Sequence, residues 1–248
     1  MEDGFEGRQR EHFARADSDH FTWQTAGPGF AELEAELLAA ALANAAAPLL
    51  EIGCGEGGNL FHLSWREQSR ATFRVGIDAY LDKLKFAARA VPAARFVCAD
   101  ASRLPFASGR FATVLIRDVL HHLADPAPTL VEACRVLAPG GTFVLIEPNA
   151  RNPLVRLQMA LVPAERGAAR SDERWLRALT RDLPLDAFEL EMAAPLPLAR
   201  VLLHHRFGVP RLGRSRLVRS LLELGDRVAT RLLPRSRWSY VVARGARA

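Results

Sequence analysis

Five short apolar runs alternate with helix-like segments between Leu49 and Asn149, and this alternation restricts the fold more than any other feature of the chain. Apolar runs of about four to eight residues, bounded by turn-forming residues, are typical of strands buried in a sheet. Strands that alternate with helices predict a parallel sheet joined by right-handed crossovers, a doubly wound α/β fold with helices on both faces. The expected strands are "PLLEIG", "FRVGID", "ARFVCAD", "FATVLIRD" and "TFVLIEPN".

Charged side chains end these strands. Ligands of doubly wound sheets bind at the carboxyl ends of the strands, close to the point where the strand order reverses. We therefore expect a functional site built from the residues at the five strand ends, which are Glu51, Asp78, Asp100, Arg117 with Asp118, and Glu147.

The loop after the first strand, "LEIGCGEGGN", contains two glycine patterns. With Gly58 as its last glycine it matches G-x-G-x-x-G, which predicts a dinucleotide whose pyrophosphate lies against the loop. Asp78 follows Gly58 by 20 residues, where an acid for the ribose is expected. The second pattern, E-x-G-x-G-x-G, consists of Glu51, Gly53, Gly55 and Gly57.

Glu51 decides between the two patterns. A carboxylate beside a pyrophosphate would repel it by an energy on the order of 1 kcal/mol or more in a partly buried site. An ammonium or a sulfonium would be attracted instead. S-adenosylmethionine (SAM) carries both of these cations, and its ribose hydroxyls suit Asp78. Asp100, followed by Ala101, could accept a hydrogen bond from the adenine amino group.

Further segments resemble the motifs of the class I SAM-dependent methyltransferases. The similarity is to the type 11 methyltransferase domain, close to the quinone and menaquinone methyltransferases. It implies a Rossmann-like sheet of about seven strands, mostly parallel, with an antiparallel C-terminal strand. The segments that carry it, in chain order, are "LLEIGCGEGGN", "VGIDAY", "ARFVCADASRLPF", "FATVLIRDVLHHLADP" and "EACRVLAPGGTFVLIEPN".

The resemblance also implies how SAM is held. Glu51 and the loop backbone would hold the methionine part, and the backbone of Arg117 would face its amino group. Arginine departs from the small or uncharged residue that is common there, which leaves the role of its side chain open. Asp78 would hold the ribose, and Asp100 with Ala101 the adenine. The full expected set is Glu51, Gly53, Cys54, Gly55, Gly57, Asn59, Asp78, Ala79, Asp100, Ala101 and Arg117.

Two adjacent histidines, His121 and His122, follow the fourth strand near the expected position of the methyl group. Histidine is the usual base near neutral pH. Neighbouring residues on a helical turn point about 100° apart, so at most one of the pair should face the pocket. The alternative is a structural pair. His12 and His20 are weaker candidates. The three cysteines form no C-x-x-C pair, so no metal site is predicted.

The chain is expected to hold one main domain. Residues 1–27 read as a loose arm or lid, and residues 28–248 as one methyltransferase domain. That domain would comprise a SAM-binding core at 48–149, an acceptor-side and helical insertion at 150–235, and a last strand at 238–244. The arm aromatics Phe13, Phe21 and Trp23 would help to hold the acceptor. Apolar residues after the fifth strand favour a lipophilic acceptor or else cover the core; they are Leu154, Leu157, Met159 and Leu161.

Positive charge gathers near the C-terminus. Leu196 to Ala248 contain twelve arginines, one glutamate and one aspartate, a net charge of +10 in a chain of net +5. Such asymmetry fits either an acidic partner or a solvated arginine-rich face. Residues 214–233 form an amphipathic pattern that could contact an anionic membrane or pack on the sheet edge. No signal peptide or membrane-spanning run is visible, so we expect a cytoplasmic protein with peripheral membrane contact left open. The oligomeric state is not predicted.

Three classes of function remain open. The first is a SAM-dependent methyltransferase acting on oxygen or carbon of a small molecule, with a lipid-like acceptor favoured. The second is an RNA or DNA methyltransferase, suggested by the basic region. The Asn/Asp-Pro-Pro-aromatic motif expected of an enzyme that methylates nitrogen of nucleic acid is replaced by "RDVLHHL", which disfavours this class. The third is a SAM-binding protein without catalysis.

Overall fold

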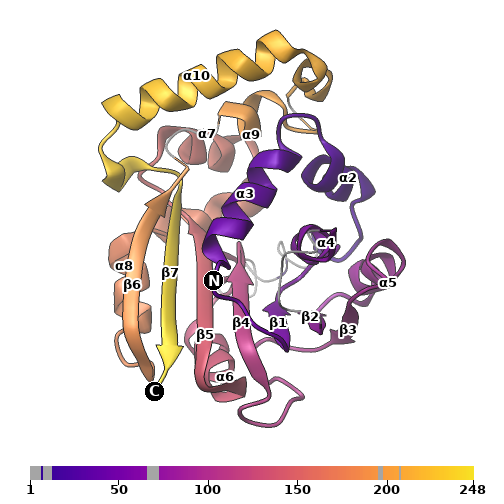
Figure 1. Cartoon of the computed structure of the whole chain (residues 1–248), viewed down its shortest axis with the longest axis vertical. Coiled ribbons are helices and arrows are strands. Elements are labelled where there is room, and N and C mark those ends of the chain that lie inside the picture. The colour runs from indigo at the N-terminus through magenta and orange to yellow at the C-terminus, as the bar shows by residue number, and fades with distance from the viewer. Residues whose placement is uncertain (1–6, 8–12, 66–72, 195–197, 207) are drawn as a thin grey trace.

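A sheet of seven strands organises the computed structural model, which describes residues 7, 13–65, 73–194, 198–206 and 208–248. The strand order is β3-β2-β1-β4-β5-β7-β6 (Figure 1). Strands β1 to β5 run parallel, and β7 lies antiparallel between β5 and β6. This confirms the expected mostly parallel sheet with an antiparallel C-terminal strand. The strands are β1 (Leu49–Ile52), β2 (Arg74–Asp78), β3 (Arg95–Cys98), β4 (Phe111–Arg117), β5 (Leu137–Pro148), β6 (Leu185–Ala193) and β7 (Tyr240–Arg247).

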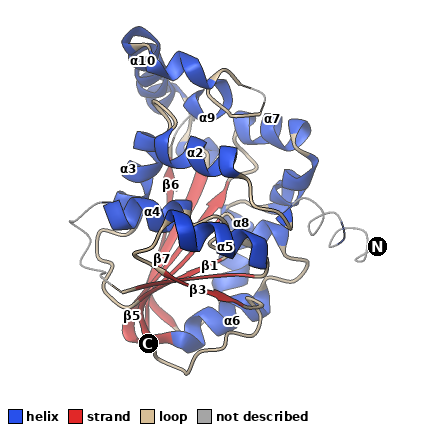
Figure 2. Ribbon diagram, turned by 90° about the vertical axis from the view of Figure 1, so that its right-hand side faces the viewer, coloured by secondary structure: helices blue, strands red, loops and turns tan. Residues whose placement is uncertain are grey.

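Helices cover both faces of the sheet, as Figure 2 shows from the side. One apolar core lies between the sheet and helices α3, α4 and α5, and a second lies between the sheet and helices α6 and α8. The described helices are α2 (Ser18–Ala26), α3 (Ala31–Ala41), α4 (Gly58–Trp65), α5 (Leu81–Ala90), α6 (Ala127–Val136), α7 (Pro153–Leu161), α8 (Glu173–Thr180), α9 (Leu198–Leu202) and α10 (Arg216–Leu232). Short 3-10 turns are η1 (Leu120–His122), η2 (Pro163–Arg170), η3 (Pro210–Arg214) and η4 (Arg235–Arg237).

Successive side chains of the central strands point to opposite cores, which explains why these strands are almost wholly apolar. Val114 and Ile116 of β4 pack in the core under α6 and α8, while Leu115 packs in the core under α3 to α5. All three are fully buried. A strand buried on both faces has no position at which a polar residue would reach water. The apolar run therefore identified the strand correctly.

Strand β5 begins earlier than the expected strand "TFVLIEPN". Helix α6 ends at Val136, and β5 begins at Leu137, which is fully buried and pairs with Phe111. The extended conformation thus begins five residues before Thr142, the first residue of the expected strand, and this places Leu137 in the core beside β4. Gly140 has a φ of 69° within a stretch where the register of β4 and β5 shifts. The glycines therefore serve an irregularity of the strand and do not end the helix.

Part of the expected arm is a packed helix. The Asp17 side chain caps α2 by accepting a hydrogen bond from the His20 amide. Trp23 is buried, and its ring stacks on Phe30 with the centroids 3.8 Å apart and the planes 6° apart. Stacked aromatic side chains contribute large buried apolar areas, so this segment has its own anchor on the domain. His12 lies outside the described residues.

Helix α10 leaves its apolar stripe in solvent. Leu222 and Ala229 on another side of the helix are buried against the body of the protein. The alternative in which the stripe packs on the sheet edge is therefore wrong. No helix in the described part of the chain is both long and apolar enough to span a membrane. The exposed stripe consists of Leu217, Leu221, Leu224, Val228 and Leu232, which are 45 to 76% exposed.

Candidate functional site

The loop between β1 and α4 follows the glycine pattern that contains Gly57. Gly53, Gly55 and Gly57 have φ angles of 73°, 52° and 85°, a region that side chains other than glycine rarely adopt. Gly58 is not among the residues with positive φ, and it begins α4. A Cβ on Gly58 would come within 2.5 Å of the Gln24 side-chain oxygen, so its small size suits the close approach of α2. The backbone conformation therefore requires the three glycines of the pattern that ends in Gly57, and it does not require Gly58.

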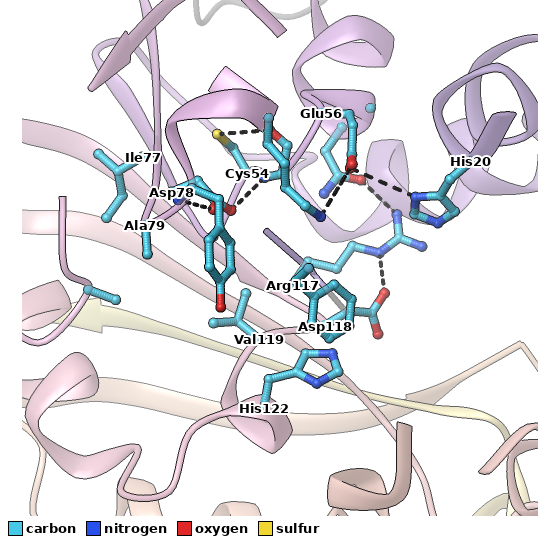
Figure 3. A pocket seen from close by; sticks show the side chains of 18 of the residues that line it. His20, Cys54, Glu56, Ile77, Asp78, Ala79, Arg117, Asp118, Val119 and His122 are labelled. Atoms are coloured by element: carbon cyan, nitrogen blue, oxygen red, sulfur yellow. Dashed lines mark hydrogen bonds and ion pairs between the residues drawn. The ribbon is translucent and has the colours of Figure 1, made fainter. Parts of the chain in front are cut away.

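A cavity of about 290 Å³ opens at the carboxyl ends of β1, β2 and β4 (Figure 3). It collects residues that lie far apart in the sequence, as the strand-end argument predicts. Of the expected site residues, Glu51, Gly57 and His121 do not line it. Those that line it are Gly53, Cys54, Gly55, Asn59, Asp78, Ala79, Asp100, Ala101, Arg117 and His122.

Glu51 lies behind the wall of this cavity and reaches it through Asn59. The Asn59 side-chain amide donates to one Glu51 carboxylate oxygen at 2.6 Å. The other oxygen, Oε2, is buried and has no hydrogen-bond partner among the described residues. Burial raises the pKa of Glu51 to about 7, although the hydrogen bond from Asn59 and the charge of Arg117 oppose this. A buried carboxylate with an unused oxygen is suited to a cationic ligand and disfavours a phosphate.

Arg117 holds Asn59 from the other side. Its guanidinium donates to Asn59 Oδ1 at 3.0 Å and to Glu34 of α3 at 2.5 Å. Its Nε also lies 3.4 Å from an oxygen of Asp118. The side chain left unassigned by the sequence therefore connects α3 to the loop and fixes the amide that orients Glu51. Asp118 has a φ of 54°, so the backbone turns sharply as it leaves β4.

Asp78 and Asp100 border the cavity from β2 and β3. Asp78 accepts hydrogen bonds from the amides of Gly55 at 3.0 Å and Tyr80 at 2.9 Å, which ties the glycine loop to the end of β2. Asp100 accepts from the amide and the hydroxyl of Ser102. Neither carboxylate caps α5. The N-cap residue of that helix is Tyr80, whose side chain forms no capping hydrogen bond.

The two histidines after β4 have different surroundings. His121 is 1% exposed, and its Nδ1 donates to Glu147 at 2.7 Å. Burial lowers the pKa of His121, but Glu147 and Glu165 outweigh burial and raise it to about 10. His122 lines the cavity, with its ring 4.7 Å from that of Phe13. His121 does not line the cavity and cannot reach a ligand there, so the base hypothesis concerns His122 alone.

Two glutamates important for this arrangement had no role assigned from the sequence, although Glu147 was among the strand-end residues expected at the site. Glu147 ends β5, and one of its oxygens accepts from the amides of Val119 and Leu120 while the other binds His121. Its place at a strand end was the available signal. Glu165 lies in η2 and lines the cavity. Nothing in the pattern of the sequence distinguishes Glu165 from an ordinary surface acid.

Glu56 in the glycine loop attaches the N-terminal segment to the site. It accepts from the Asp17 amide at 2.9 Å, lies 3.2 Å from the Lys83 ammonium and 3.9 Å from His20. Burial raises the pKa of Glu56, but its bond with His20 and the charge of Lys83 lower it to about 2. Phe13 and His20 both line the cavity. The segment expected as a lid therefore contributes to the cavity wall.

Comparisons with known proteins point to one family. Residues 50–145 match the family model described as a methyltransferase domain. A fatty-acid O-methyltransferase of Mycolicibacterium smegmatis is 34% identical over 118 residues, which cover 47% of this chain and 42% of that protein. A demethylmenaquinone methyltransferase of Thermus thermophilus is 36% identical over 111 residues, covering 43% of this chain and 50% of that protein.

Solved structures show the same fold over almost the whole chain. A SAM-dependent methyltransferase of Thermotoga maritima superposes with a TM-score of 0.66 at 17% identity, covering 98% of this chain and all of that one. The sequence matches are shorter: the chain spans between about a third and a half of the length of the first curated relatives that it matches. The family model covers residues 50–145, which contain most of the residues that line the cavity.

Proposed function

We propose that this chain, which carries a methyltransferase domain over residues 50–145, transfers a methyl group from SAM to oxygen or carbon of a small lipophilic molecule. The observation that carries the proposal is the buried Glu51 carboxylate with an unused oxygen, which lies behind the wall of the cavity that Asp78 and Asp100 line. A cationic methionine end at Glu51, a ribose at Asp78 and an adenine at Asp100 match these three acids in strand order.

The chain's own residues would supply position and orientation. SAM when bound supplies the activated methyl group, so the protein's main task is to align donor and acceptor. Arg117 and Asn59 would hold Glu51 in place, and Gly53 allows the backbone to pass close to Val119, from which a Cβ would be only 2.3 Å away. His122 faces the cavity and would contact the acceptor near its reacting atom.

Calorimetry with SAM and with NADH tests the cofactor. We expect one SAM molecule to bind per chain and NADH not to bind. Binding of NADH without binding of SAM would restore the dinucleotide reading of the loop. Binding of SAM without methyl transfer to any fraction of an extract would favour the reading as a SAM-binding protein.

A lipophilic acceptor is supported by two observations. The named relatives include a fatty-acid O-methyltransferase and a demethylmenaquinone methyltransferase, both with lipophilic substrates by name. Apolar side chains, those of Phe13, Val119 and Leu123, share the cavity with His122. An acceptor with an apolar body and a single hydroxyl or activated carbon would fit these surroundings.

We also propose that the α10 end of the molecule rests on an anionic membrane surface. Helices α7, α9 and α10 lie together at one end (Figure 1). An exposed apolar stripe flanked by arginines is typical of helices that lie in the membrane interface. Of the large exposed apolar side chains in the described chain, most belong to this end: Leu157, Leu161, Leu202, Val209, Leu212, Leu217, Leu221, Leu224, Val228 and Leu232.

Sedimentation with liposomes tests this contact. The intact protein should sediment with vesicles that contain phosphatidylglycerol and less with pure phosphatidylcholine vesicles. Replacement of Leu217, Leu221 and Leu224 by serine should release it. Val131→Ser, at a 59% exposed position on α6, is the matched control and should have no effect. An intact protein that never sediments with anionic vesicles would contradict the proposal.

A further inference from the structure

Three potential metal ligands meet at the edge of the cavity. His121 and His122 lie in η1, and Glu165 lies in η2, two segments more than forty residues apart that pack together. One ligand atom from each side chain can be chosen so that all three lie within 4.8 Å of one another. His122 and Glu165 also line the cavity. Two imidazoles and one carboxylate form a ligand set suited to divalent transition metals.

His121 has the arrangement expected of a metal-binding histidine. Its Nδ1 donates to Glu147 Oε2 at 2.7 Å, and Glu147 is itself held by the amides of Val119 and Leu120. A carboxylate bound to one ring nitrogen fixes the orientation of the ring and directs the other nitrogen to the metal. The other nitrogen, Nε2, is buried, and it has no hydrogen-bond partner in the described part of the chain.

The distance between His121 and Glu165 also favours an ion between them. His121 Nε2 lies 3.4 Å from Glu165 Oε2. A hydrogen bond between charged groups has a length of about 2.7–2.9 Å. Two ligands of a tetrahedral zinc ion, with bonds of about 2.1 Å, lie about 3.4 Å apart. The observed separation is thus closer to the spacing of two ligands of one metal ion than to the length of a charged hydrogen bond.

We propose that His121, His122 and Glu165 bind one divalent transition metal ion, such as zinc, with Glu147 orienting His121. A small rotation of His122 would complete the three-ligand set. Three protein ligands leave a fourth position, which is the arrangement of zinc sites that act on a substrate. Because His122 and Glu165 line the cavity, the fourth position faces the space assigned to the acceptor.

The metal would bind a hydroxyl oxygen of the acceptor. Coordination lowers the pKa of such an oxygen, so its proton passes to water at a lower pH. The oxygen then forms a bond with the methyl carbon as the bond between that carbon and sulfur breaks, and S-adenosylhomocysteine leaves. In this role His122 is a ligand and does not take the proton itself. This step rests on the proposed methyl transfer, but the metal site does not.

Titration of the full-length, chelator-treated protein with zinc chloride tests the site. We expect one zinc ion per chain by calorimetry, and a visible spectrum typical of tetrahedral coordination when cobalt(II) replaces zinc. Glu165→Gln and His122→Asn should each weaken zinc binding tenfold or more. These two variants are preferred to changes of the buried His121, and thermal unfolding should establish that both are folded.

Two control variants exclude adventitious binding. His205→Asn changes a second histidine group, in which the His204 and His205 rings lie 4.6 Å apart. Glu173→Gln changes an exposed acid of α8 that pairs with Arg177. Neither should change zinc binding. Absence of zinc binding, or binding that survives both Glu165→Gln and His122→Asn, would overturn the proposal.

Treatment with a chelator tests whether the metal site takes part in methyl transfer. If the site serves the acceptor, a chelator should abolish methyl transfer and zinc should restore it, while SAM affinity stays the same. Zinc binding together with chelator-resistant methyl transfer would overturn the role in catalysis. Because the zinc titration does not depend on methyl transfer, it decides the site even if the proposed function fails.

Discussion

At the scale of single residues, a series of hydrogen-bonded side chains from α3 to the glycine loop fixes the position of the Glu51 carboxylate, which we expect to face the cationic end of the ligand. Glu34 holds Arg117, Arg117 holds Asn59, and Asn59 holds Glu51. Glu34, Arg117 and Glu51 are buried, so removal of one member leaves a buried polar group without its partner. The strength with which SAM is held should therefore depend on residues that do not touch it.

Asp78→Asn should weaken SAM binding by about 10- to 100-fold, because hydrogen bonds to charged groups contribute about 1.5–3 kcal/mol. The amide oxygen can still accept from Gly55 or Tyr80, so the fold should survive. Calorimetry with SAM measures the effect. Asp182→Asn, at an exposed position after α8, is the control. Unchanged affinity in Asp78→Asn would remove the ribose assignment.

The response of the protein to pH should report on Glu51. Its pKa is about 7 in the folded protein, against 4.5 as the ordinary value. Between these values the folded state keeps a proton that the unfolded chain has lost, so the contribution of Glu51 to stability falls as pH rises from about 4.5 to about 7. The ammonium group of a bound ligand would compensate the negative charge that Glu51 gains when it loses its proton.

The rise in melting temperature caused by SAM should therefore be larger at pH 7.0 than at pH 5.5. An α-amino group remains mostly protonated at both values, because its pKa is about 7.7–8.0. Differential scanning fluorimetry measures the rise, and Glu51→Gln should make it independent of pH. An equal rise at both values in the unaltered protein would show that Glu51 does not pair with the ligand.

The two histidines should differ in their effect on stability, because only His121 is the partner of the buried Glu147. His122→Asn should lower turnover at least tenfold with little change in melting temperature. His121→Asn removes the partner of the buried Glu147 and should cost about 3–5 kcal/mol of the free energy of unfolding. Methylation assays and urea unfolding test the two parts. Two small losses of turnover, with unchanged stability, would contradict this division.

The residues of the site were predictable to the extent that they end strands or belong to the glycine loop. Asp78, Asp100 and Asn59 line the cavity as expected because sheet topology alone brings strand ends together. Glu165 and Glu34 could not be predicted, since they come from helical segments whose place over the sheet depends on tertiary packing. The role of the Arg117 side chain could not be predicted for the same reason, because its partner Glu34 lies on α3.

At the scale of elements, the strands were easier to predict than the segments that cover the site. The buried strands β1, β2 and β4 are read directly from apolar runs. Helix α2 was expected as a loose arm because its apolar residues form no clear stripe. Its order comes from a few specific contacts, such as Trp23 on Phe30 and Asp17 with Glu56. Such contacts have no periodic signal in the sequence.

Trp23→Ala should therefore destabilise the domain by about 3–5 kcal/mol, the usual cost of removing a buried large aromatic side chain. Urea unfolding measures the loss. It should also weaken SAM binding, since α2 carries His20 to the cavity wall. Trp175→Ala on α8, a partly buried position on the opposite face of the sheet, is a control for SAM binding. A change of less than 1 kcal/mol for Trp23→Ala would mean that α2 is held elsewhere.

At the scale of the whole molecule, we propose that the chain divides into a half that binds SAM and a half that binds the acceptor. The family model covers residues 50–145, whereas the helical segments after β5 carry Glu165 and most of the exposed apolar residues. The sequence predicted the first half well, because its motifs are ordered along the chain. The role of the second half could not be predicted in the same way. It depends on which faces of α7 to α10 are exposed, and apolar content alone does not determine that.

The most direct test of the proposed function is a transfer assay with methyl-labelled SAM and a cell extract separated into lipid, RNA, protein and small-molecule fractions. We expect label in the lipid fraction, and we expect its loss with Asp78→Asn. Label confined to the RNA fraction would contradict a lipophilic acceptor. Absence of label from every fraction, in a protein that binds SAM, would contradict methyl transfer itself.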